Sequence, residues 1–107
     1  MSPTTASQSL PAVPLEVLEF ATEQGVVPYL RPLLTMTRGI FPDESIRLRL
    51  EEDPESADQR TIAVEVDVTD WTVAEMLAAH NQWSEQLFRV CPATKVCAFR
   101  IGMVQTL

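Results

Sequence analysis

The single histidine of the chain, His80, is the side chain best suited to acid–base chemistry. Ser84 follows four residues later, so on a helix its hydroxyl would lie beside the imidazole. A nucleophile–base pair also needs a carboxylate that orients the histidine, and Glu85 falls on a different helix face. No glycine-rich elbow accompanies the pair. We therefore predict a boundary histidine packed between Leu77 and Trp83, and we assign no catalytic residue.

A second concentration of reactive groups is acidic. Five of the 15 carboxylates fall within eight residues and are accompanied by no base: Glu51, Glu52, Asp53, Glu55 and Asp58. Such oxygens suit divalent cations, but the segment lacks the alternating pattern of a calcium loop, and Pro54 stands at a ligand position. We predict a solvated hairpin tip that could attract a basic partner surface, and no metal site.

The remainder of the chain carries ten acidic and eight basic residues, so the formal charge of −7 belongs largely to that one segment. A chain with this balance lacks the basic stripe expected of a nucleic-acid binder. Five residues separate Cys91 from Cys97, a spacing typical of neither a redox pair nor a zinc site. We predict two reduced thiols, with a disulfide across the turn as the alternative, and we predict no cofactor and no nucleic-acid partner.

Two segments around the acidic residues alternate apolar and polar side chains, which is typical of strands with one buried face. In Ser45–Glu51 the outward residues include Arg47 and Arg49, and in Thr61–Thr69 they include Glu65 and Asp67. Pairing Glu51 with Thr61 would place Arg47 opposite Glu65, and a shift by two residues would place Arg49 there instead. Either register predicts cross-strand ion pairs on the exposed face.

Helices are predicted on both sides of this hairpin. Pro14–Gln24 ends at the natural cap Gly25, and Tyr29–Arg38 follows it. The best-specified helix begins at Thr72, because Thr72 and Glu75 fit a capping box, and it ends before Pro92. Its predicted buried stripe is Val73, Met76/Leu77, His80, Trp83/Ser84 and Leu87. Trp71, just before this helix, is a candidate for core packing or for partner contact.

The last predicted strand, Lys95–Val104, is apolar on both faces except for Lys95 and Arg100. We predict an α+β fold of two layers in the order ααββαβ, with a mixed three-stranded sheet of order 3-1-2. That order would place Arg100 beside Arg47 and Arg49, as a candidate anion or acidic-peptide site. An uncharged edge strand is a pairing template, so we predict a homodimer formed through the last strand.

These observations predict one domain over residues 14–107, after a disordered tail over residues 1–13 that does not resemble a secretory signal. With no apolar run of membrane-spanning length, we expect a cytoplasmic protein. We favour a non-catalytic interaction module that binds itself and an unidentified protein through Arg47, Arg49, Arg100 and Trp71. The alternative is a ligand-binding or minor enzymatic domain with a pocket near His80 and Arg100.

Overall fold

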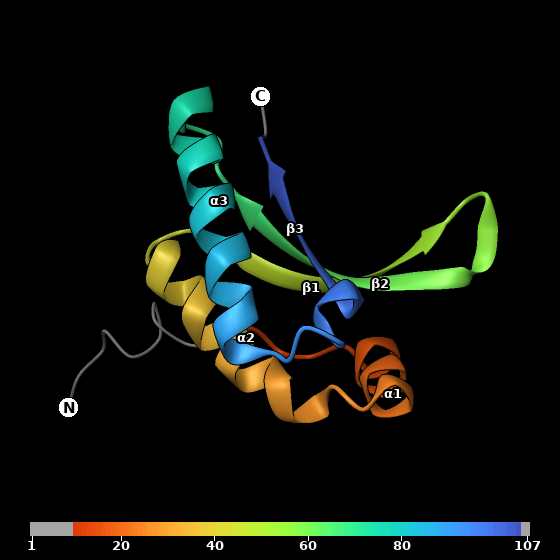
Figure 1. Cartoon of the computed structure of the whole chain (residues 1–107). Helices are drawn as coiled ribbons and strands as arrows, with labels where there is room; N and C mark the ends of the chain where they lie inside the picture. The colour runs from red at the N-terminus through yellow and green to blue at the C-terminus, as the bar shows by residue number, and fades with distance from the viewer. Residues whose placement is uncertain (1–9, 106–107) are drawn as a thin grey trace.

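The computed structural model describes residues 10–105, apart from the side chains of residues 56–58. Its helices and strands follow the order ααββαβ and form the predicted α+β fold (Figure 1). The elements are α1 (Leu15–Gln24), α2 (Val27–Ile40), β1 (Ile46–Asp53), β2 (Ser56–Asp67), α3 (Val73–Val90) and β3 (Phe99–Val104). Most of the predicted tail falls outside the described residues, but Leu10 and Val13 already pack against the core.

The first two helices follow from local signals. Pro14 precedes α1, and Gly25 ends it with a φ of 70°, a conformation that glycine adopts without a Cβ clash. Helix α2 begins at Val27, earlier than predicted, and contains Pro32 in its second turn. The residues of these two helices that face the core are Val17, Phe20, Ala21, Leu30, Leu33, Leu34, Met36 and Thr37.

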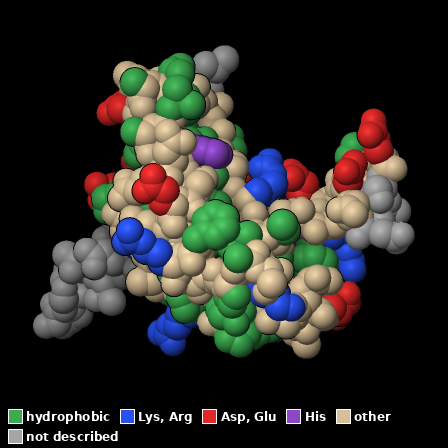
Figure 2. All heavy atoms as spheres, in the orientation of Figure 1, with side chains coloured by type: hydrophobic (Ala, Val, Ile, Leu, Met, Phe, Trp, Pro, Cys, Tyr) green, Lys and Arg blue, Asp and Glu red, His purple; other side chains and the backbone are tan. Residues whose placement is uncertain are grey.

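The sheet order is β1-β2-β3, so the predicted order 3-1-2 is wrong. Strand β2 is central: it pairs antiparallel with β1 and parallel with β3. The hairpin has the first of the two predicted registers, because Glu51 pairs with Thr61 and Arg47 with Glu65. The hairpin is also longer than predicted and projects from the body with acidic side chains at its tip (Figures 1 and 2).

The aliphatic face of the sheet is buried, and its opposite face carries the charged side chains. The buried strand residues are Ile46, Leu48, Ile62, Val64, Val66, Phe99 and Ile101. Trp83 of α3 joins this core, and its indole N–H donates to the Thr37 hydroxyl of α2 at 2.9 Å. That hydroxyl in turn donates to the Leu33 carbonyl, so the buried polar groups satisfy one another.

Helix α3 begins with the predicted capping box. The Thr72 hydroxyl accepts from the Glu75 N–H at 3.1 Å, and the Glu75 carboxylate accepts from the Thr72 N–H at 2.8 Å. The helix packs against α2 and β3. No helix within residues 10–105 is both long and apolar enough to span a membrane.

Candidate functional site

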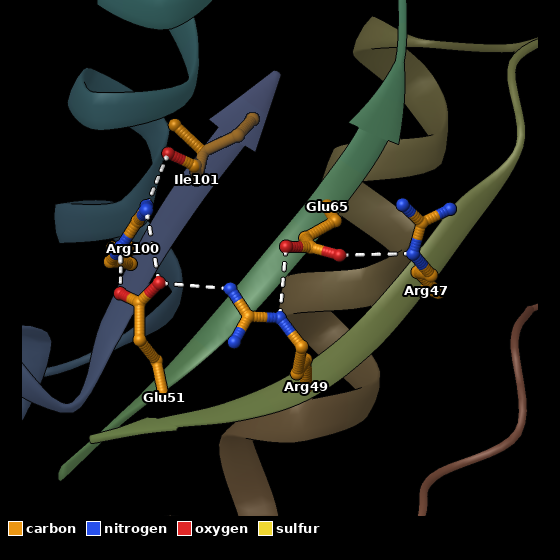
Figure 3. A network of polar contacts seen from close by, with 6 residues as sticks. All are labelled: Arg47, Arg49, Glu51, Glu65, Arg100 and Ile101. Carbon is orange, nitrogen blue, oxygen red and sulfur yellow. Dashed lines mark hydrogen bonds and ion pairs between the residues drawn. The ribbon is translucent and has the colours of Figure 1, made fainter. Parts of the chain in front are cut away.

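The exposed face of the sheet carries a continuous chain of ion pairs (Figure 3). Arg47 and Arg49 lie two residues apart on β1, and each donates its Nε–H to one oxygen of Glu65, at 2.9 and 3.0 Å. Arg49 also donates from Nη2 to Glu51 at 2.9 Å. Glu51 then accepts from Arg100 Nε at 2.6 Å. Three arginines thus alternate with two glutamates across all three strands.

The small central residue Ala63 explains how this chain crosses the sheet. In register, Ala63 lies between Arg49 of β1 and Arg100 of β3. Its methyl group leaves room for longer side chains to meet above it, and it is fully buried although it belongs to the polar face. Arg100 was expected near Arg47 and Arg49 only if β1 were the central strand. In the observed strand order β2 is central, and the Glu51 side chain links Arg100 to Arg49 by reaching across β2.

The two charged groups at the middle of this chain have shifted pKa values. Partial burial would raise the pKa of Glu65, but hydrogen bonds from Arg49 and Arg47 outweigh it and hold that pKa below its ordinary value. Hydrogen bonds to Glu65 and Glu51 raise the pKa of Arg49 further. Both pKa shifts therefore favour the charged state, of Glu65 in one case and of Arg49 in the other.

Strand β3 forms one edge of the sheet, and no strand among residues 10–105 pairs with its outer side. Its one charged residue, Arg100, is turned back toward Glu51, and the guanidinium lies over Gly102, about 3.5 Å from where a Cβ would stand. Arg100 also donates to the Ile101 carbonyl at 3.3 Å. The predicted strand is shorter than expected, since residues Val96–Ala98 form a 3-10 turn.

Strand β1, at the other edge, differs in charge. Five of its eight residues are charged: Arg47, Arg49, Glu51, Glu52 and Asp53. Charged side chains on an edge strand discourage pairing with another chain. Of the two edges, the one formed by β3 is therefore the less protected.

The outer face of α3 corrects the prediction for His80. The helix buries Ala79, Trp83 and Leu87, whereas His80 is exposed. The predicted stripe is confirmed at Trp83 and Leu87 and wrong at Val73, Leu77 and His80, because α3 carries two adjacent apolar stripes and only one of them faces the core. The second stripe is solvent-exposed, with Val73 67%, Leu77 60% and Phe88 61% exposed. We call Val73, Leu77, His80, Ser84 and Phe88 the outer stripe.

The other predicted site residues lie apart from this face. Trp71 is half-buried, and its ring lies 5.2 Å from that of Phe41. At the hairpin tip, the Asp53 carboxylate accepts from the Glu55 N–H at 2.9 Å, and the Asp58 side chain lies outside the described residues. Glu51 and Glu52 belong to β1, and Glu51 joins the ion-pair chain.

Both cysteines are free; Cys91 is buried and Cys97 is exposed. Burial raises the pKa of the Cys91 thiol, and Lys95 opposes the shift only in part. Cys97 lines a half-open cleft of about 250 Å³ together with Arg60 and Lys95, a cleft that sequence reasoning did not anticipate because its walls come from α1, β2 and the Val96–Ala98 turn. In the part of the chain that the structure describes, no group of three or more His, Cys, Asp or Glu side chains could hold a metal ion.

Comparison with protein-family models, with curated proteins and with solved structures gave no match to this chain.

Proposed function

We propose that this protein is a non-catalytic assembly module that forms a homodimer through the outer edge of β3. The observation that carries the proposal is the orientation of Arg100: the only charge on this edge strand is held by Glu51, toward the middle of the sheet. An edge strand without an outward charge is a ready template for a second copy. Two copies related by a two-fold axis would form one six-stranded sheet.

The backbone of β3 supports this pairing. The Val68 N–H donates to the Val104 carbonyl at 2.8 Å, so Val104 directs its backbone groups toward β2. Backbone groups of successive strand residues point to opposite edges, so Ile101 and Met103 direct theirs outward, whereas the Phe99 N–H donates to the Val96 carbonyl of the preceding turn. At 3.3 Å, the Arg100 contact to the Ile101 carbonyl is longer than a usual N–H···O bond. We expect a partner N–H to replace it.

The proposal includes a two-layer arrangement, with the helices on the aliphatic face and the arginines on the open face. In this arrangement the arginine face stays accessible in the dimer. Arg47 is 55% exposed, and it offers an acidic segment of a second protein a guanidinium with unused donors. We propose a cytosolic location, in keeping with two free thiols.

The geometry supports this module better than the ligand-binding alternative. His80 lies on the exposed side of α3, and Arg100 is engaged by Glu51. The 250 Å³ cleft is lined by other residues. A catalytic or ligand-binding role for His80 would need a pocket wall and a carboxylate beside it.

Amide hydrogen exchange tests the proposed dimer within a single strand. The N–H groups of Ile101 and Met103 should be protected at high protein concentration and lose at least about tenfold of that protection on dilution. The N–H groups of Arg100 and Gly102, which face β2, should stay protected at both concentrations and are the internal control. Outward amides that exchange freely at every concentration would refute the proposal.

A further inference from the structure

The outer stripe of α3 is an apolar surface without a partner in the described structure. Its residues recur at intervals of four, three, four and four along the helix, so they lie on one face. Figure 2 shows hydrophobic side chains above and below the histidine, with acidic and basic side chains nearby. The three large apolar side chains of the stripe, Val73, Leu77 and Phe88, are each more than half exposed, and apolar side chains aligned on one face are typical of an interaction surface.

We propose that a second copy of this chain covers the outer stripe, by packing its own α3 antiparallel against it across the two-fold axis of the β3 dimer. This inference rests on the proposed function and extends it from the strand edge to the helix. Antiparallel β3 strands lie about 4.8 Å apart. Because α3 packs beside β3, the helices of the two copies would come within reach of the usual 8–10 Å packing distance.

The outer stripe is self-complementary in this orientation. If the two-fold axis passes between His80 and Asn81, Val73 faces the partner's Phe88 and Leu77 faces the partner's Ser84. The same axis sets Glu85 against the partner's Met76 and Arg89 against the partner's Thr72, so no like charges meet. In Figure 1 the middle of α3 lies level with the middle of β3, so one axis can serve both elements.

The area that a stable dimer needs also favours this arrangement. Pairing of a six-residue edge strand alone buries little side-chain surface. The outer stripe adds Val73, Leu77 and Phe88, each more than half exposed, to the surface that a dimer would bury. Specific interfaces rarely bury less than roughly 1,000 Å², so a dimer that uses both the strand edge and the stripe is favoured over one that uses the strand alone.

The first test changes the stripe without touching the core. Leu77→Glu should raise the dimer dissociation constant, measured by sedimentation equilibrium, by at least about tenfold, because it would bury a charge at the interface. Leu15→Glu is the matched control, because Leu15 is 71% exposed on α1, away from the stripe. Equal dissociation constants for the two variants would overturn the helix contact.

The second test uses disulfide formation, in a Cys97→Ser background, to determine whether the two α3 helices pack antiparallel. The double variant Val73→Cys/Phe88→Cys should form a covalent dimer on mild oxidation. Val73→Cys alone should not, because antiparallel helices hold the two copies of this position about 22 Å apart along the axis. Efficient linkage of Val73→Cys alone would indicate parallel helices and overturn the inference.

The two proposals can fail separately. If the outward amides of β3 are protected but Leu77→Glu leaves the dimer intact, the strand pairs without the helix, and only the helix contact is refuted. If the outward amides exchange freely while Leu77→Glu dissociates a dimer, the helices associate without the strand. A chain that sediments as a monomer at all accessible concentrations refutes both.

Discussion

Neutralising Glu65 is the sharpest perturbation of the ion-pair chain. Its side chain is only 14% exposed, and it accepts one hydrogen bond from each of two arginines that lie side by side on β1. Glu65→Gln keeps the shape but removes the charge between them. An exposed ion pair contributes up to about 1 kcal/mol; because Glu65 is mostly buried and serves two partners, we expect a loss of about 1–2 kcal/mol at pH 7.

The pH dependence separates this loss from a packing defect. The folded pKa of Glu65 is lowered, so its contribution is fully present above the pKa of an unfolded glutamate, about 4.3. The contribution disappears as the pH falls through the lower folded pKa. The difference in unfolding free energy between the wild type and Glu65→Gln should therefore be largest at neutral pH and shrink steadily below pH of about 4.3.

Urea unfolding at several pH values measures this difference. All samples need the same protein concentration, because association would add to the apparent stability. Glu19→Gln, on the exposed face of α1, is the control for loss of a surface carboxylate. A difference below about 0.3 kcal/mol at pH 7, or one that persists unchanged at pH 3, would refute the assigned role of Glu65.

Three further predictions concern the start of α3, the core and the two cysteines. Thr72→Ala should destabilise the fold by about 1 kcal/mol in thermal or urea unfolding, through loss of the capping bond to Glu75. Thr37→Val should cost about 1–3 kcal/mol, because the buried Trp83 N–H loses its acceptor; equal stability would contradict that bond. With an aromatic disulfide reagent, Cys97 should react in the folded protein and Cys91 only after unfolding, so that Cys97→Ser removes the rapid phase.

The features that were predictable from the sequence are encoded locally. The hairpin register follows from alternation, because a one-residue slip would expose every aliphatic side chain. The start of α3 follows from Thr72 and Glu75, three residues apart. The opposite charges of Arg47 and Glu65 were also readable in advance, since each strand carries one sign on its outward face.

The features that were missed depend on packing between distant segments. The strand order could have been inferred from Ala63, a small apolar residue on the polar face of β2. Ala63 and its neighbours Ile62 and Val64 are all buried, and burial on both faces of a strand is typical of a central strand. The buried face of α3 was predicted only in part: Trp83 and Leu87 are buried as expected, but Val73 and Leu77 belong to a second apolar stripe that is exposed. Local hydrophobicity cannot choose between two such stripes; contact with α2 and β3 does.

The same ion-pair chain that stabilises the open face also leaves the edge of β3 unprotected. Lysine or arginine on an edge strand normally keeps other chains away by holding a charge in solvent at that edge. Here Glu51 lies on β1, three residues before the hairpin turn. Its carboxylate accepts a hydrogen bond from Arg100 Nε at 2.6 Å and draws the guanidinium toward the middle of the sheet. At the edge itself the guanidinium keeps one contact, from Nη1 to the Ile101 carbonyl at 3.3 Å, and Glu51 balances its charge. This is why the charge pattern of β3, taken alone, understates how open the strand is to a second copy.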